Sequence, residues 1–356
     1  MRGREPTKVM QSSRPACCAL VVWICIACGC ELMIMAGQPV QERPLVIAHR
    51  GASGYVPEHT LAGVAVAVAQ GADFVEPDVV LSKDGTPIVL HDIYLDTVTN
   101  VREVFPQRAR SDQRYYAIDF TLEEIKQLRV HERIDVRTGR RVYPQRFPRK
   151  ETDLRVPTLA EWIEMLQGLN QSMGRHAGIY PEIKNPAWHR QHNLDISTVV
   201  LSTLSRYGYR DRRAPCYLQC FDAAELRRLR NELQTDLRLV QLFSEDAWRA
   251  KDGQWDEERM KNDLAACAEY CAGIGVDLRL LVNVDAEGRA VANSVVAEAH
   301  RLGLVVHAYT FRRDALPEFA VSFDELVRLF VQDVKVDGLF TDFPDVTNEI
   351  LLRLLP

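Results

Sequence analysis

The sequence lacks several features that would assign it to a class at once. It has no uncharged apolar run long enough to cross a bilayer, no internal repeat and no low-complexity segment. The 44 basic residues are outnumbered by 49 acidic ones, the net charge is −5, and no basic stripe stands out. A nucleic-acid partner is therefore not expected. No Gly-rich nucleotide fingerprint follows the first strand-like run, which disfavours a dinucleotide-binding domain.

Cysteine is scarce in the main part of the chain. Of nine cysteines, all but Cys216, Cys220, Cys267 and Cys271 lie at or before residue 30. Cys216 and Cys220 lie in a strand-like run, about 13 Å apart if extended, which is too far for a disulfide. Cys267 and Cys271 lie one helical turn apart. Since no histidines stand at zinc-binding spacing, we expect all four to be structural.

The first 37 residues have the pattern of an export leader. Basic residues precede the uncharged segment ACCALVVWICIACG (16–29), as in a secretory signal. The segment ends in ACGC at Cys30, which loosely resembles the lipobox of bacterial lipoproteins. Three outcomes stay open: lipidation of Cys30, which would tether the protein to a membrane, ordinary cleavage near MAG (35–37), or a retained anchor. We expect an exported protein, either periplasmic or a lipoprotein of the outer or cell membrane.

From residue 45 onward, short apolar runs alternate with helical segments of about 10–15 residues. About eight strand-like runs occupy residues 43–352, which predicts an α/β fold in the form of a TIM (β/α)8 barrel. Residues 93–155 interrupt the alternation because they are polar, Arg-rich and irregular. We interpret them as an insertion near the catalytic face. A doubly wound open sheet is the alternative, which the missing nucleotide fingerprint disfavours.

Polar side chains stand at the ends of the predicted strands. Two of these ends carry pairs of residues two positions apart, which a strand places on the same face. In a parallel barrel all carboxyl ends meet at one rim, where barrel active sites lie, so these side chains are expected to converge. The residues are His49, Arg50, Glu76, Asp78, His91, Glu182 and Lys184.

The residue types limit the chemistry of such a site. The three carboxylates offer only oxygen ligands, which favours a hard divalent cation, Mg²⁺ or Ca²⁺, over Zn²⁺. The arginine and the lysine add the positive charge that an anionic substrate requires. The two histidines can take and give protons near neutral pH. Together these groups indicate cleavage of a phosphodiester.

Several long motifs carry a resemblance to a known family. AHRGASGYVPEHT (48–60), GADFVEPDVVLSKDGTPIVLHD (71–92), YPEIK (180–184) and LFTDFPD (339–345) resemble motifs of the glycerophosphodiester phosphodiesterases. The similarity covers roughly residues 45–350. The insertion resembles that of the bacterial exported members, the GlpQ type, which are periplasmic proteins or lipoproteins.

The resemblance implies a reaction and its participants. His49 and His91 would be the acid/base pair, and Arg50 and Lys184 would contact the phosphate. The family cleaves glycerophosphodiesters, for example glycerophosphocholine and glycerophosphoethanolamine, to sn-glycerol 3-phosphate and an alcohol. Which histidine is the base and which the acid stays open.

The resemblance also implies a cofactor. Glu76, Asp78 and Glu182 would hold a divalent ion, typically Ca²⁺ in the exported members, with Mg²⁺ as the alternative. No other partner than the small-molecule substrate is implied.

The sequence also suggests an aromatic wall for the substrate, and it leaves two other functions open. Phe221, Tyr309 and Phe343 would form an aromatic wall for the glycerol, with core packing as the alternative for each. A protein of another class, a surface-tethered binding or adhesion lipoprotein on an inactive barrel, is the second hypothesis. A barrel lyase that uses Mg²⁺ on a carboxylate substrate is the third.

Overall fold

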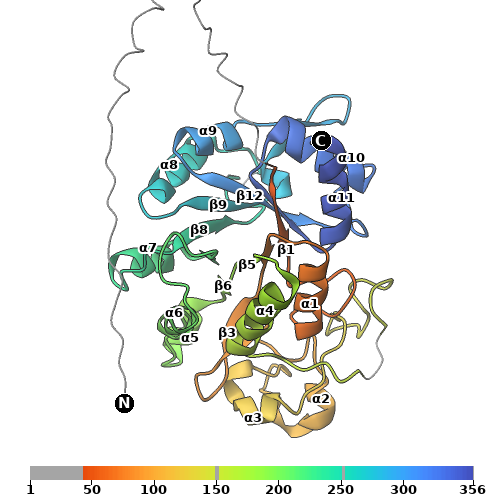
Figure 1. The fold of residues 1–356 in the computed structure, drawn as a ribbon, viewed down its shortest axis with the longest axis vertical. Helices are drawn as coiled ribbons and strands as arrows, with labels where there is room; N and C mark the ends of the chain where they lie inside the picture. Colours follow the sequence, from red (N-terminus) through yellow and green to blue (C-terminus); the bar gives the residue numbers. More distant parts are fainter. Residues whose placement is uncertain (1–42, 149–151, 251–252, 356) are drawn as a thin grey trace, which may run out of the picture. The chain divides into compact units, whose positions relative to one another are not determined.

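The structure is a computed structural model that describes residues 43–148, 152–250 and 253–355. The predicted leader, residues 1–37 with Cys30, lies outside the described residues. Figure 1 shows strands in the middle of the fold and helices packed on their outer side. Within the described residues no helix is both long enough and apolar enough to span a membrane.

The strand pairings close a ring. β1 pairs with β13 on one side and with β2 on the other, and every pairing around the ring is parallel. The second barrel strand is divided into β2 and β3 near Pro77, and the third into β5 and β6 near Pro181. Proline has no amide hydrogen to donate to a ladder, which explains both interruptions. Counted in this way, the described residues form eight parallel barrel strands, and the predicted TIM-barrel-like α/β fold is confirmed.

The strands are short, as the brief apolar runs of the sequence predict. In chain order they are β1 (Leu45–Ala48), β2 (Phe74–Val75), β3 (Asp78–Leu81), β4 (Pro87–Val89), β5 (Gly178–Ile179), β6 (Glu182–Ile183), β7 (Tyr217–Cys220), β8 (Arg238–Phe243), β9 (Gly273–Asp277), β10 (Val282–Val284), β11 (Ala290–Ala292), β12 (Val305–Phe311) and β13 (Gly338–Thr341). β4 pairs antiparallel with β3 and so forms a hairpin beside the barrel. β10 and β11 form a separate hairpin.

Several helices begin at residues whose side chains accept hydrogen bonds from the first free backbone amides. α4 (Leu159–Met173) starts with a capping box of Thr158 and Glu161 and ends at Gly174, whose φ is +62°. The others are α1 (Leu61–Ala69), α2 (Val101–Val104), α3 (Leu122–Ile125), α5 (Pro186–Gln191), α6 (Ile196–Arg206), α7 (Ala223–Asn231), α8 (Glu257–Ala268), α9 (Val295–Arg301), α10 (Phe323–Arg328) and α11 (Pro344–Leu354).

The interior of the barrel is apolar and aromatic. Tyr180 stacks on Tyr217 with ring centroids 4.9 Å apart and meets Phe340 edge to face at 5.0 Å. Each large apolar side chain buried in this way stabilises the fold by about 1.5–3 kcal/mol. His307 of β12 also lies among these rings, with its Nδ1 2.8 Å from the Tyr180 hydroxyl oxygen, whereas the acidic and basic side chains of the pocket described below lie at the rim. The buried apolar residues that form this cluster inside the barrel are Ile47, Phe74, Tyr180, Tyr217, Val240 and Phe340.

The predicted insertion, residues 93–155, contains α2 and α3 and has a hydrophobic core of its own. Phe120, Ile125 and Leu128 of the insertion are fully buried and belong to one cluster with Val80 and Ile88 of the β3–β4 hairpin. The insertion is therefore fixed to the barrel by packing.

The four described cysteines are free. Cys216, Cys220 and Cys267 are buried, and Cys271 is partly buried. Their surroundings agree with the structural role expected from the sequence.

Candidate active site

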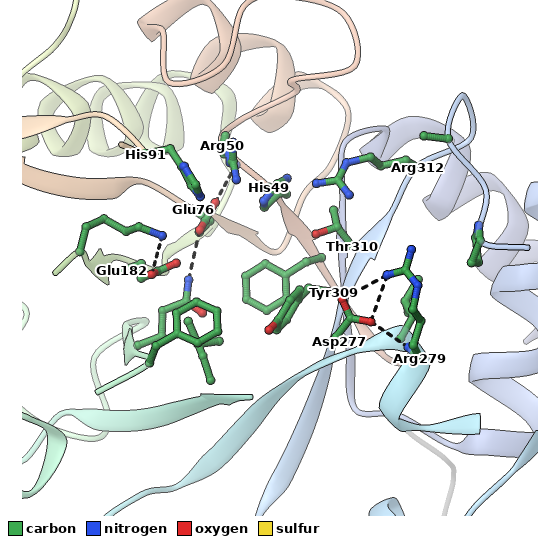
Figure 2. A pocket seen from close by; sticks show the side chains of 18 residues that line it. His49, Arg50, Glu76, His91, Glu182, Asp277, Arg279, Tyr309, Thr310 and Arg312 are labelled. Atoms are coloured by element: carbon green, nitrogen blue, oxygen red, sulfur yellow. Dashed lines mark hydrogen bonds and ion pairs between the residues drawn. The ribbon is translucent and has the colours of Figure 1, made fainter. Parts of the chain in front are cut away.

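The carboxyl ends of the barrel strands surround a pocket of about 230 Å³ (Figure 2). His49 and Arg50 follow β1 directly, and His91 follows the β3–β4 hairpin. The close-up shows His91 and His49 on opposite sides of Glu76, which accepts a hydrogen bond from Arg50. The predicted residues that line the pocket are His49, Arg50, Glu76, His91, Glu182, Lys184, Phe221 and Tyr309.

Three carboxylates form a cluster at this rim. Glu76, Asp78 and Glu182 each have one oxygen within 4.8 Å of the other two, and all three are buried. Glu76 and Asp78 flank Pro77, where the second barrel strand is interrupted. Asp78 lies directly opposite Glu182 in the register of β3 with β6. The spacing of two residues and the parallel pairing thus place the three acids side by side.

Burial and mutual repulsion disfavour full ionisation of this cluster. Burial and the charge of Asp78 raise the pKa of Glu76 well above its ordinary value, and burial raises the pKa of Glu182 to about 8. Burial also opposes ionisation of Asp78, but Lys184 and a hydrogen bond from His59 hold its pKa well below the usual range.

The cluster fits a cation. Among the described residues, Asp78 Oδ1 is buried without a hydrogen-bond partner, which a bound ion would satisfy. The ligands are all carboxylate oxygens, as hard divalent cations such as Ca²⁺ and Mg²⁺ prefer. Glu76, Asp78 and Glu182 are therefore the residues that would hold such an ion.

Arg50 reaches the site through an unusual backbone conformation. Its φ is +58°, and the following Gly51 has a φ of +79°, where an added Cβ would lie 2.9 Å from the Gly63 backbone. This turn lets the Arg50 amide donate a hydrogen bond of 2.7 Å to Glu76 Oε2. Strained backbone conformations of this kind occur mainly at functional sites. The Arg50 guanidinium lies 3.2 Å from both oxygens of Glu58.

Lys184 supplies a second positive charge. Its Nζ lies 2.7 Å from Glu182 Oε1 and 3.7 Å from Asp78 Oδ1. Burial disfavours the ammonium, but the two carboxylates outweigh burial and raise the pKa of Lys184. The lysine is therefore charged at neutral pH and can contact an anion in the pocket.

His49 is held by a carboxylate from the far end of the sequence. Its Nδ1 lies 2.7 Å from Asp342 Oδ1, and Asp342 directly follows β13, the neighbour of β1. Asp342 Oδ2 accepts hydrogen bonds from Arg146 at 2.7 Å and from Arg312 at 3.0 Å. Burial lowers the pKa of His49 to about 4, so its ring is neutral at neutral pH. A neutral ring with Nδ1 bonded to Asp342 leaves Nε2 as the nitrogen that can exchange a proton.

His91 has an equivalent partner next to it in the sequence. Its Nδ1 lies 2.6 Å from Asp92 Oδ1. Asp92 Oδ2 accepts hydrogen bonds from Thr97 and from Arg133, both at 2.7 Å. Burial, followed by the charges of nearby basic residues, lowers the pKa of His91 to about 3. The pocket therefore holds two neutral imidazoles, each bonded to a carboxylate.

The aromatic residues divide into two groups. Phe221, which is 45% exposed, and Tyr309 line the pocket, with ring centroids 6.3 Å apart. Phe343, for which core packing was the alternative, is not among the residues that line this pocket. Phe343 is buried at the start of α11, where its ring fills the space that a Cβ on Gly54 would need. Phe340, which points into the barrel from β13, lines the pocket instead.

Comparison with known proteins identifies the family. The model of the glycerophosphoryl diester phosphodiesterase family matches residues 49–346. The chain belongs to this family. The match includes both histidines, both basic residues and all three clustered carboxylates, so the pocket described above lies within the family domain.

Two bacterial glycerophosphodiester phosphodiesterases are similar over nearly their whole length. The protein of Haemophilus influenzae is 39% identical over 350 residues, which cover 93% of this chain and 96% of the relative. The protein of Treponema pallidum is 36% identical over 325 residues, which cover 86% of this chain and 91% of the relative. The predicted enzyme class, a glycerophosphodiester phosphodiesterase, is confirmed by these relatives and by the family match.

Solved structures of the family have the same fold. One from Silicibacter pomeroyi, named as a candidate glycerophosphoryl diester phosphodiesterase, has a TM-score of 0.66 at 27% identity and covers 89% of this chain and 95% of that chain. A phosphodiesterase of Oleispira antarctica in complex with the product sn-glycerol-3-phosphate has a TM-score of 0.57 at 23% identity. The match covers 87% of this chain and 97% of that chain.

Several polar residues of this phosphodiesterase site were not anticipated from the sequence. Gln219 donates a hydrogen bond of 3.2 Å to Glu76 Oε1, and its place at the end of β7 matches the strand-end pattern used for the others. Arg133 and Arg146 come from the irregular part of the insertion, where no periodicity marks them. The remaining polar residues of the pocket wall that the sequence analysis did not name are Asp277, Arg279, Thr310 and Arg312.

Proposed function

We propose that this phosphodiesterase hydrolyses glycerophosphodiesters, such as glycerophosphocholine and glycerophosphoethanolamine, to sn-glycerol 3-phosphate and an alcohol. The observation that carries the proposal is a pocket in which two neutral imidazoles, each bonded through Nδ1 to a carboxylate, face three clustered acids. The product complex of the Oleispira antarctica phosphodiesterase supports the choice of product.

His49 and His91 are proposed to carry the protons. Cleavage breaks one P–O bond, so a proton must leave the nucleophile and another must reach the departing alcohol. One neutral imidazole accepts the first proton at Nε2. The other takes up a proton from solvent at Nε2 when the phosphate anion of the bound substrate stabilises the protonated ring, and it delivers this proton to the departing alcohol oxygen. The nucleophile is either water or the neighbouring glycerol hydroxyl, in which case a cyclic phosphate forms first and is then hydrolysed.

Arg50 and Lys184 are proposed to bind the phosphate. Both are charged and lie at the pocket wall, Lys184 buried and Arg50 with 14% of its side chain exposed, where charge-assisted hydrogen bonds to phosphate oxygens are strong. They hold the diester between the two imidazoles and offset the negative charge that develops on the phosphate. Phe221 and Tyr309 offer apolar surface to the glycerol carbons beside them.

A divalent cation on Glu76, Asp78 and Glu182 is proposed as the cofactor. When bound, it adds Lewis-acid stabilisation of the phosphate charge. We propose Ca²⁺, in line with the exported members that the sequence resembles, with Mg²⁺ as the alternative. A metal-replacement assay at matched free-ion concentrations distinguishes the two ions.

We further propose that the protein is an exported, GlpQ-type member with a leader over residues 1–37. The basic start and the apolar segment 16–29 support export. If Cys30 is lipidated, labelled fatty acid enters the wild type but not Cys30→Ala. Label in both proteins, or in neither, rejects the membrane tether through Cys30.

The central test is a product assay. Release of sn-glycerol 3-phosphate from glycerophosphocholine and glycerophosphoethanolamine is measured with an enzyme-coupled readout. We expect activity that EDTA abolishes and added Ca²⁺ restores. A folded protein that releases no product from any glycerophosphodiester would contradict the proposal and favour the binding or adhesion function on an inactive barrel.

A further inference from the structure

Two arginines of the insertion contact the carboxylates that hold the two histidines. Arg133 and Arg146 lie outside the barrel strands, in the Arg-rich segment between α3 and α4. Both are largely buried, with 16% and 4% of their side-chain surface exposed. They line a cavity that shares His49, Arg50 and His91 with the main pocket. Burying a guanidinium is costly unless it is fully paired, so their partners are informative.

Arg133 connects two acids of the site. Its Nη1 donates a hydrogen bond of 2.7 Å to Asp92 Oδ2, the oxygen opposite the one that holds His91. Its Nε and Nη2 donate to the two oxygens of Glu58 at 2.9 and 2.6 Å. These contacts are shorter than the 3.2 Å contacts of Glu58 with Arg50. Arg133 therefore makes the stronger contacts to Glu58, so Glu58 holds the Arg50 guanidinium only through the longer pair.

Arg146 has the same relation to the other histidine. Its Nη2 donates to Asp342 Oδ2 at 2.7 Å, and its Nε and Nη2 hold Asp314 at 2.8 and 2.9 Å. Its guanidinium carbon lies 3.6 Å from the ring centroid of Tyr143, also in the insertion. The planar guanidinium of Arg146 is hydrogen-bonded on two edges and stacked on a ring, so it can take only one orientation. The hydrogen bond from Arg146 then fixes the orientation of the Asp342 carboxylate.

We propose that Arg133 and Arg146 are positioning residues of the active site, each fixing the carboxylate that orients one histidine. Arg133 acts through Asp92 on His91, and Arg146 acts through Asp342 on His49. The insertion thereby completes a site whose other residues come from the barrel rim. This inference rests on the proposed function for its kinetic part and on geometry alone for its spectroscopic part.

The kinetic test compares matched arginine variants. Arg146→Met is expected to lower kcat about 10–100-fold, the scale for loss of a residue that orients a catalytic group, with little change in KM. Arg133→Met is expected to lower kcat similarly and also to raise KM, because Glu58 then draws Arg50 away from the phosphate. Arg146→Lys and Arg133→Lys, which keep the charge and one hydrogen bond, should recover part of kcat.

Arg114→Met is the control. Arg114 belongs to the same insertion and holds the buried Asp96 at 3.0 Å, with 23% of its side chain exposed. Asp96 contacts neither histidine in the described structure, so this variant should lose stability but keep kcat. An equal loss of kcat in Arg114→Met would overturn the inference, since any broken ion pair in the insertion would then have the same effect.

A double-mutant cycle separates positioning from general support. If Arg146 acts through His49, Arg146→Met should cause no further loss of kcat in the His49→Ala background, whereas it should still cause the full loss in the His91→Ala background. Arg133→Met should show the reverse pattern. Equal losses in both backgrounds would contradict the assignment.

Proton NMR tests the inference whether or not glycerophosphodiesters are cleaved. Each Nδ1–H bonded to a carboxylate should give a downfield signal, assigned by its loss in His49→Gln or His91→Gln. Arg146→Met should shift only the His49 signal, and Arg133→Met only the His91 signal. Signals that stay unchanged in both variants would overturn the inference, whereas an inactive wild type with the expected shifts would contradict only the proposed function.

Discussion

His49 and Asp342 come from neighbouring strands of the barrel, whereas His91 and Asp92 follow the antiparallel strand β4. The first pair is the more deeply buried, with 11% and 1% of the side-chain surfaces exposed against 30% and 19% for the second. Asp342 is bonded to two arginines besides His49, and Asp92 to one arginine and Thr97. The same imidazole–carboxylate arrangement is thus built once into the closed sheet and once onto a hairpin, and the insertion supplies one arginine to each.

The backbones of the two histidines are held in place by different contacts. The backbone of His49 is fixed by the ladder of the barrel, and its amide donates to Thr341 O of β13 at 2.9 Å. The backbone after His91 has no such ladder, and the side chains of the insertion take over this role. The two halves of the site should therefore respond differently when a partner is removed.

The largest effect is expected from the histidines themselves. His49→Ala and His91→Ala should each lower kcat about 10²–10⁴-fold, the usual scale for a general acid or base. The loss is measured as the initial rate of sn-glycerol 3-phosphate release at saturating cation. If one variant keeps the wild-type rate, that histidine is not part of the acid/base pair and the comparison between the two pairs loses its meaning.

The next largest effect is a difference in unfolding free energy between variants of the two carboxylates, Asp342 and Asp92. Asp342→Asn leaves two arginines facing a neutral group in a fully buried position, which should cost about 3–5 kcal/mol of unfolding free energy. Asp92→Asn should cost clearly less because Asp92 is more exposed. Urea denaturation of both variants gives the two values. Equal losses would show that burial in the barrel does not distinguish the pairs.

A pH dependence should follow from His49. Its pKa falls from 6.5 to about 4 on burial, so between these values the unfolded chain binds a proton that the folded protein does not. The unfolding free energy contributed by this group therefore falls as pH is lowered from about 6.5 toward 4. Glu182, whose pKa burial raises to about 8, acts in the opposite direction.

Comparison of the wild type with His49→Gln isolates the histidine. The variant should lose stability less steeply than the wild type when urea denaturation is repeated between pH 6.5 and 5. Parallel pH profiles would mean that His49 titrates in the folded protein as it does in the unfolded chain.

The smallest effect concerns the pocket wall. Phe221→Ala should raise KM by a few-fold, since a half-exposed ring loses about 1 kcal/mol of apolar contact with the substrate. Phe343→Ala should leave KM unchanged and lower the unfolding temperature, because Phe343 packs against Gly54 and Tyr55 away from the pocket. A raised KM in Phe343→Ala would return this residue to the substrate wall.

Local patterns were enough to find most of the central site. Glu76 with Asp78 and Glu182 with Lys184 stand two residues apart in strand-like runs, and parallel strands bring their carboxyl ends to one rim. Arg50 follows the first strand, so the same argument places it at this rim. Periodicity along the chain therefore predicts the barrel and the residues that its strands deliver.

The rest depends on contacts that no local pattern records. The bond between His49 and Asp342 joins residues 293 positions apart and exists only because the last strand pairs with the first. Arg133 and Arg146 lie in a segment without regular structure, so nothing in its spacing marks a direction for their side chains. Phe340 and Phe343 differ because the first belongs to β13 and the second follows the strand end, a boundary that pattern alone places only approximately.

The pairing of β1 with β13 also has a consequence for biosynthesis. A ribosome delivers His49 earlier than Asp342 by 293 residues, so a nascent chain has no partner for this histidine until β13 has emerged. A chain clipped before β13 would carry all three clustered carboxylates and still lack one of the two oriented imidazoles. Hydrolytic capacity should thus arise only at ring closure, in the same step that completes the fold.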